Sequence, residues 1–188
     1  MADALEKRFL GEVRRSTAEG RRLVGMAARY GPIADLGSFQ ERIAPGAFSG
    51  SLGAQRDILA LFDHDPTKVL GRTQTKTLIL EDRSDGLAFN IALPETTAGR
   101  DALALAERGD LGGASIGFIV TSESLDGETR VIERAKLFEI SVVSAWPAYV
   151  ETSVEARREL PRCAAPGVSI LTPETMSLNQ LKKYLETI

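Results

Sequence analysis

The sequence has almost none of the cysteine and histidine residues that build disulfides and zinc sites. Its 188 residues include one cysteine, Cys163, and one histidine, His64. A single cysteine cannot form an internal disulfide, which is typical of a protein in a reducing compartment. Cys163 lies in the Pro-flanked stretch LPRCAAPG, which indicates a linker rather than a nucleophile. Because the usual nitrogen and sulfur ligands of zinc are missing and nothing marks an all-oxygen site, the sequence predicts no metal and no other cofactor.

Long apolar runs and an excess of positive charge are also absent. No run approaches the roughly 20 apolar residues of a membrane span, and the N-terminus lacks the apolar core of a signal peptide. We therefore expect an intracellular protein without membrane contact. The net charge of −3 offers no basic excess for phosphates, so no nucleic-acid partner is expected. One basic group near the N-terminus alternates with glutamates and is interpreted as a solvated flank. It comprises Lys7, Arg8, Arg14, Arg15, Arg21 and Arg22.

The composition that remains is that of a globular protein, with 43% apolar and 26% charged residues. The length suits one domain with a single core, followed by a tail. We place the domain over residues 1–160. Residues 161–173 are rich in Pro, Ala and Gly and are predicted to be a linker. Apolar residues then recur at helical spacing over 177–188, so the tail 161–188 is predicted to end in an amphipathic helix.

Within the domain, strand patterns outnumber helix patterns. Two apolar segments flank the turn at residues 83–86, where Asp-Gly predicts a hairpin. Residues 96–110 predict a helix that begins at a threonine cap and ends at Gly109 in the left-handed conformation. Residues 115–146 predict two or three further strands. The predicted fold class is therefore α+β, mostly β with helices.

The stretch GASIG at residues 113–117 is a literal G-x-S-x-G. That spacing is the nucleophile elbow of α/β-hydrolases, which needs a strand before the serine and a helix after it. Here a predicted helix precedes Ser115, and a β-branched strand follows it. The histidine of those enzymes also follows the serine, whereas His64 precedes Ser115. The motif is therefore not an elbow, and a nucleophilic Ser115 would need a different architecture.

A serine nucleophile needs an adjacent base, and the histidine available for this role is His64. His64 follows the apolar run ILALF, and the end of such a strand can present an imidazole rigidly. A third group should orient the imidazole, and Asp63 and Asp65 are its neighbours in sequence. If this segment is extended, both aspartates face away from His64, because successive side chains alternate. The orienting group should then come from elsewhere.

Glu139 is the alternative carboxylate. It lies in the apolar strand pattern KLFEISVVSAW, and its parity predicts that it shares a face with Leu137 and Ser141. A carboxylate in such a strand belongs either to a solvent-facing side or to a partly buried functional group. The pattern by itself leaves both interpretations open.

Five segments carry a family resemblance through their order along the chain. They are GMAARYG, ERIAPGAF, LFDHDPTKVLG, LGGASIGF and LFEISVVSAWPAY. Together they resemble the prohead maturation proteases of tailed bacteriophages, which accompany the Hong Kong 97 type of capsid and are related in fold to the herpesvirus assemblins. The resemblance covers residues 23–151 and implies a closed, mostly antiparallel β-barrel surrounded by helices.

The resemblance also implies roles for three residues. Ser115 in GASIGF matches the nucleophile, and His64 in the HD motif matches the general base. The third member in assemblins is a second histidine, which this sequence lacks. Glu139, 24 residues after Ser115, stands at the comparable place, so the orienting role is carried onto it. Oxyanion-binding amides are expected near the glycines around Ser115 or in the turn at Ala148.

The activity implied by the resemblance is that of a serine endopeptidase. Its substrate would be the scaffolding segment of the major capsid protein, and also the protease itself, inside the procapsid in the cytoplasm of the bacterial host. Because assemblins act as dimers, a dimer or higher oligomer is expected by analogy. Two other functions stay open. One is an esterase or amidase with the same three residues, and the other is a catalytically inactive scaffold or capsid-binding module that acts through the C-terminal helix.

Overall fold

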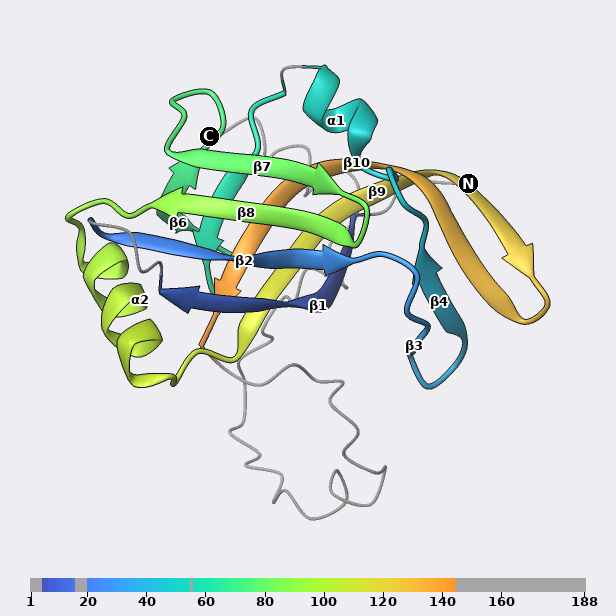
Figure 1. Cartoon of the computed structure of the whole chain (residues 1–188), viewed down its shortest axis with the longest axis horizontal. Coiled ribbons are helices and arrows are strands. Elements are labelled where there is room, and N and C mark those ends of the chain that lie inside the picture. Colours follow the sequence, from blue (N-terminus) through green and yellow to red (C-terminus); the bar gives the residue numbers. More distant parts are fainter. Residues whose placement is uncertain (1–4, 16–19, 55, 145–188) are drawn as a thin grey trace, which may run out of the picture. The chain divides into compact units, whose positions relative to one another are not determined.

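The structure is a computed structural model that describes residues 5–15, 20–54 and 56–144 (Figure 1). In this part of the chain, ten β-strands outweigh two helices, α1 (Ser49–Gly53) and α2 (Thr97–Arg108), which confirms the predicted mostly β, α+β class. The strands are β1 (Glu6–Arg15), β2 (Arg22–Arg29), β3 (Ala34–Asp35), β4 (Gln40–Ile43), β5 (Leu59–Phe62), β6 (Asp65–Arg72), β7 (Leu78–Arg83), β8 (Gly86–Ala92), β9 (Gly113–Asp126) and β10 (Thr129–Val143). The predicted linker at 161–173 and the helix after it lie outside the described residues.

One continuous sheet contains all of these strands. Its main path runs β3-β4-β10-β9-β1-β2-β8-β7, and β5 joins the edge of β10 beyond β4, with β6 paired to β5. Most pairs are antiparallel, but β10 runs parallel to both β4 and β5. In Figure 1, β7, β8, β2 and β1 run across the view one below another, and β10 and β9 run obliquely behind them. The strands β5, β10 and β9 are therefore direct neighbours, although β5 precedes β9 by about fifty residues.

The closed barrel expected from the family resemblance is not observed. Among the described residues, the ladder ends at β7 on one side and at β3 and β6 on the other. The end of β6 meets the connection to β7 instead of a strand: the Arg72 amide donates to Thr77 Oγ1 at 2.9 Å. Gly71 also lies so close to this connection that a Cβ there would be 3.1 Å from the Thr77 carbonyl oxygen. Turn contacts thus occupy the place where a closing ladder would form.

Two local predictions are confirmed. The Thr96 side chain accepts a hydrogen bond from the Gly99 amide and caps α2, and Gly109 ends the helix with a φ of 76°. The hairpin is formed by β7 and β8, with Arg83 paired to Gly86 across the turn. The sequence alone indicates these elements because a helix cap or a tight turn depends on residues only a few positions apart. Neither helix of the described part is long and apolar enough to cross a membrane.

The hydrophobic core covers one face of the β5–β10–β9 region. Alternation along β9 directs Ala114, Ile116 and Phe118 into this core, where Phe118 meets the edge of the Phe48 ring at a centroid distance of 5.9 Å. Burying a side chain of this size stabilises a fold by about 2 kcal/mol. A slip of one residue would exchange the two faces of the strand, so the core fixes the register of β9. Ser115 is consequently held on the opposite face.

The predicted solvated flank is wrong for Arg8. Its guanidinium donates to the carboxylate of Glu41 at 2.6 and 2.9 Å, and Arg130 donates to the same carboxylate at 2.9 Å. Glu41 is only 2% exposed, so this is a buried ionic cluster, which Glu6 completes by accepting from both arginines. The cluster ties β1 to β4 and β10. The members of the cluster lie far apart in sequence, so the charges next to Arg8 in sequence do not indicate that it is partly buried.

The stability that Glu6 contributes through this cluster depends on pH. Burial by itself raises the pKa of the Glu6 carboxyl, but hydrogen bonds from Arg130 and the charges of Arg8 and Arg130 outweigh burial and hold the pKa below its ordinary value. A carboxyl with a lowered folded pKa contributes stability that is present above its unfolded pKa. That contribution is lost as the pH falls through the lower folded value.

Candidate active site

His64 lies at the tip of the β5–β6 hairpin. Phe62 pairs with Asp65, so Asp63 and His64 form a two-residue loop. Their φ angles are 54° and 58°, and positive values at both positions define a type I′ turn. Such turns favour Asn-Gly, and a non-glycine residue in the left-handed region carries strain of about 1 kcal/mol or more. The histidine therefore occupies a backbone conformation that the surrounding structure must hold in place.

Asp63 fixes the turn through its hydrogen bonds. Its amide donates to the Val142 carbonyl at 2.9 Å, and its carboxylate accepts from the amide and hydroxyl of Ser144 at 2.7 to 2.9 Å. Both contacts tie the turn to the end of β10. Asp63 is a residue that the sequence analysis weighed only as a partner for His64. Its structural role depends on Ser144, 81 positions away, which no local pattern indicates.

Asp65 is also turned to other partners. The hydroxyl and amide of Thr67 donate to its carboxylate at 2.6 and 2.9 Å, and these hydrogen bonds hold the pKa of Asp65 below its ordinary value. The assumption of an extended segment up to Asp65 was wrong, because β5 ends at Phe62 and the left-handed turn follows. Among the described residues, no hydrogen bond or ion pair joins the side chain of Asp63 or Asp65 to the imidazole.

Glu139 is the carboxylate that meets His64. The distance from His64 Nδ1 to Glu139 Oε1 is 2.6 Å, and the two side chains are 21% and 11% exposed. Glu139 lies on β10, paired to Leu59 of β5 on one side and to Gly117 of β9 on the other. An ionised carboxylate can only accept a hydrogen bond, so Nδ1 must carry the proton in this contact. The lone pair of the neutral imidazole is then on Nε2, free to accept a proton.

A β-bulge directs Glu139 toward the histidine. Leu137 pairs with Phe118, but the next pair is Glu139 with Gly117, so Phe138 is an extra residue on β10. The prediction that Glu139 shares a face with Leu137 is therefore wrong, because Leu137 lies in the hydrophobic core on the opposite face. Glu139 does share its face with Ser141, since no bulge separates them. Bulges are frequent beside functional sites because they re-aim side chains in this way.

Gly117 makes room for the carboxylate. A Cβ at this position would lie 2.7 Å from Glu139 Cγ and 2.9 Å from Oε1, which is closer than real contacts allow. The Glu139 side chain thus lies directly over the backbone of β9. This role was not predicted, although a glycine inside a strand pattern often indicates such a close approach.

Ser115 lies two residues before Gly117 on the same face of β9. It pairs directly with Ser141, which makes Ser115 a diagonal neighbour of Glu139, at a separation of about 7–8 Å. Ser115 is only 3% exposed, and its hydroxyl donates to the Arg8 carbonyl of β1 at 3.0 Å. The structure thus brings His64 and Glu139 into contact and places Ser115 diagonally across from Glu139, with its hydroxyl donating toward β1 rather than toward the imidazole.

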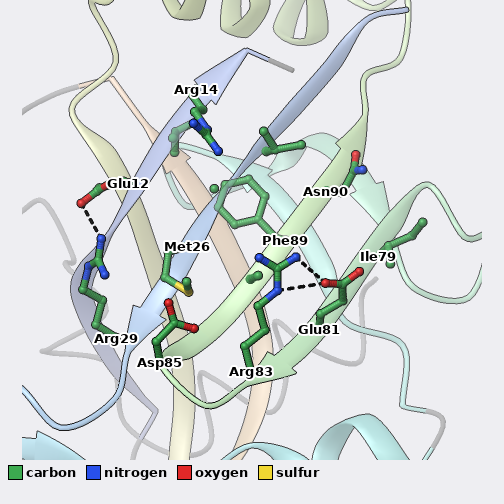
Figure 2. A pocket seen from close by; sticks show the side chains of 14 residues that line it. Glu12, Arg14, Met26, Arg29, Ile79, Glu81, Arg83, Asp85, Phe89 and Asn90 are labelled. Atoms are coloured by element: carbon green, nitrogen blue, oxygen red, sulfur yellow. Dashed lines mark hydrogen bonds and ion pairs between the residues drawn. The ribbon is translucent and has the colours of Figure 1, made fainter. Parts of the chain in front are cut away.

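A depression of about 510 Å³ lies elsewhere, over β1, β2, β7 and β8 (Figure 2). Figure 2 shows the Phe89 ring within it and ion pairs of Glu12 with Arg29 and Glu81 with Arg83 along its sides. None of the three predicted site residues lines it. The depression and the His64–Glu139 pair therefore lie in different parts of the described structure. The pair is the stronger indicator of chemistry, because an imidazole can move protons near neutral pH.

No group of three or more His, Cys, Asp and Glu side chains in the described part of the chain is arranged to hold a metal ion.

Gly117→Ala tests the close approach of Glu139. The added methyl must push Glu139 aside, so we expect a loss of about 1–3 kcal/mol in the free energy of unfolding, measured by chemical denaturation. Gly53→Ala is the matched control, because a Cβ there meets nothing within 4 Å. The control should change stability by less than about 1 kcal/mol. Equal stabilities of the two variants would contradict the packing described for Gly117.

Comparisons with known proteins bear on the family and the fold of the chain. A comparison with curated proteins finds no significant relative. Among solved structures, the bacteriophage T4 capsid assembly protease, gp21, is similar with a TM-score of 0.52 at 12% identity, over 76% of this chain and 98% of that one. At this identity the likeness supports the fold alone. The family model of the caudovirus prohead serine proteases matches residues 11–164, which include both strands of the site and the His64 hairpin. The chain therefore belongs to the caudovirus prohead serine protease family.

Proposed function

We propose that Ser115, His64 and Glu139 form the catalytic triad of a capsid-maturation endopeptidase. One observation carries this proposal: the His64 imidazole contacts the Glu139 carboxylate at 2.6 Å beside Ser115. A serine protease that uses a histidine base has one candidate in this chain, because His64 is its single histidine. The contact supports Glu139, and not Asp63 or Asp65, as the group that orients this base.

The chemistry begins with a change of partner for the Ser115 hydroxyl. In the structure its proton is donated to the Arg8 carbonyl, so the side chain must turn toward His64 Nε2 before reaction. His64 then accepts the proton while Ser115 Oγ attacks the peptide carbonyl, and the resulting imidazolium is stabilised by Glu139. His64 returns the proton to the leaving amine. Water repeats the same steps on the acyl-enzyme and restores Ser115.

Two other serines could be considered as the nucleophile, and their contacts argue against both. The Ser144 hydroxyl donates to the Asp63 carboxylate at 2.8 and 2.9 Å, so its partner is not an imidazole. Ser141 is 1% exposed, less than Ser115, and is flanked on β5 by the apolar Leu61. Ser115 lies beside Gly117, over which Glu139 extends. This placement favours Ser115.

The proposed substrate is the scaffolding segment of the major capsid protein, with self-cleavage as a second reaction. Family membership as a prohead serine protease supports a capsid protein as substrate, and the fold shared with a capsid assembly protease is consistent with it. The reaction would take place inside the procapsid in the host cytoplasm, and a dimer or higher oligomer would be the active form. The predicted oxyanion turn at Ala148 lies outside the described residues, so the oxyanion donors are left unassigned.

Ser115→Ala tests the nucleophile. Removing it should lower cleavage of capsid protein and self-shortening by at least about a thousandfold, as loss of a triad serine does. Both reactions can be followed by mass spectrometry of the purified proteins, with circular dichroism as a check that the variant folds. Cleavage retained by the variant would assign the reaction to another serine. If the wild-type chain also stays intact and leaves capsid protein whole, the chain acts as a binding module instead.

Glu139→Gln tests the orienting carboxylate. A glutamine keeps the shape but removes the charge that stabilises the imidazolium, so kcat/KM for capsid cleavage should fall by about 10²–10⁴-fold. Asp65→Asn is the matched control, because its carboxylate bonds Thr67 and Lys68 and not His64. The control should change kcat/KM by less than about fivefold. A crippling Asp65→Asn together with a mild Glu139→Gln would reverse the assignment.

A further inference from the structure

The hydroxyl of Ser141 is an unexplained polar group in the structure. Ser141 is 1% exposed, and its Oγ has no hydrogen-bond partner within the described residues. Buried hydroxyls are normally paired, and an exception calls for an explanation. Ser51 shows the usual case at 3% exposure, since its hydroxyl donates to the Ala135 carbonyl and accepts from the Leu137 amide.

The ladder places Ser141 directly opposite Ser115. The two residues pair across β10 and β9, so their Cβ atoms are about 4.5–5.5 Å apart on one face, and paired serines at this separation can hydrogen-bond. On the other side of β10, Ser141 pairs with Leu61, whose side chain offers no polar group. Glu139 shares the face but is two residues away, at about 7 Å along the strand. Ser115 is thus the polar side chain directly across from Ser141.

In the structure, the hydroxyls of Ser115 and Ser141 are not hydrogen-bonded to each other. Ser115 Oγ donates to the Arg8 carbonyl at 3.0 Å, and this bond must break before the hydroxyl can donate to His64. A donor on the opposite side of Ser115 would favour the turned orientation by engaging a lone pair of Oγ. Ser141 carries an unpaired hydroxyl directly across the ladder from Ser115, on the side away from β1.

We propose that Ser141 is a positioning residue for the nucleophile: its hydroxyl donates a hydrogen bond to Ser115 Oγ when that oxygen turns from the Arg8 carbonyl toward His64. The proposal rests on the proposed function, in which Ser115 is the nucleophile. Ser141 keeps its proton throughout, because the proton that His64 accepts is that of Ser115. The vacant hydrogen bond in the resting structure is then filled only in the reactive arrangement.

This role predicts a combination of effects that a structural serine does not produce. Removing an unpaired buried hydroxyl should leave stability unchanged or raise it, because no bond is lost and one desolvated group disappears. The same change should slow the reaction of Ser115. A structural serine such as Ser51 should give the reverse, with lower stability and an unchanged reaction rate.

The test is the rate at which an alkyl fluorophosphonate labels the full chain, with the adduct located by peptide mass spectrometry. Ser141→Ala should be labelled at Ser115 about 10–100-fold more slowly than wild type, with the same midpoint in its pH–rate profile and an unfolding midpoint that is equal or higher. Ser141→Thr retains a hydroxyl and should recover most of the rate. Ser51→Ala, the matched control, should be labelled within about twofold of wild type but unfold at lower denaturant.

Several outcomes would overturn the positioning role while leaving Ser115 as the nucleophile. They are labelling of Ser141→Ala at the wild-type rate, a slow Ser141→Ala that also loses stability as Ser51→Ala does, and a fully stable Ser141→Thr that is as slow as Ser141→Ala. Failure of the proposed function has a different signature: Ser115→Ala is still labelled, or wild type is not labelled. An adduct on Ser141 itself would overturn both assignments.

Discussion

The hydrogen bond from His64 to Glu139 joins the tip of one hairpin to the middle of a neighbouring strand, and the arrangement of the site depends on it. Three features bring the two groups within 2.6 Å. His64 lies in the left-handed turn that follows β5. The bulge at Phe138 places Glu139 on the face of β10 opposite the core. Gly117 has no side chain and leaves the space that Glu139 occupies. Loss of any one of these features would separate the imidazole from its carboxylate.

The two faces of the β5–β10–β9 region carry different kinds of residues. One face carries the apolar core that fixes the strand registers, and the other carries Ser115, Ser141 and Glu139. Because register is set by the core, the polar residues can be arranged for function at a local cost. That cost is visible as two left-handed residues in the His64 turn and an unpaired hydroxyl at Ser141. The ionic cluster around Glu41 adds a second constraint, since it fixes the part of β1 whose carbonyl binds Ser115.

Structural features that depend on residues close together in the sequence were predicted correctly. The cap and end of α2 and the turn between β7 and β8 were predicted from residues within the elements themselves. The three candidate site residues came from motif order and spacing, and the structure brings His64 and Glu139 of that set into contact.

The features that were missed depend on partners distant in sequence or on backbone detail. The bulge at Phe138 inserts one residue into β10, and a two-residue period cannot reveal such an insertion. The turn at His64 uses Asp-His where Asn-Gly is usual, and it is held by Ser144, which directly follows β10. Arg8 is neutralised by Glu41, 33 positions away, so its burial is invisible in local charge patterning. The sheet is open at β6, where the Arg72 amide donates to Thr77, and the motifs that carry the family resemblance give no information on such contacts.

The tautomer of His64 tests the central claim most directly. Because the chain has one histidine, the imidazole nitrogens of a 15N-labelled sample give unambiguous NMR signals. At a pH where the ring is neutral, the contact with Glu139 requires the proton on Nδ1 and a bare Nε2. That tautomer is the expected result in the wild-type chain, and Glu139→Ala should lose it. A wild-type spectrum with the proton on Nε2 would mean that Glu139 does not orient the base, and it would contradict the triad built on this pair.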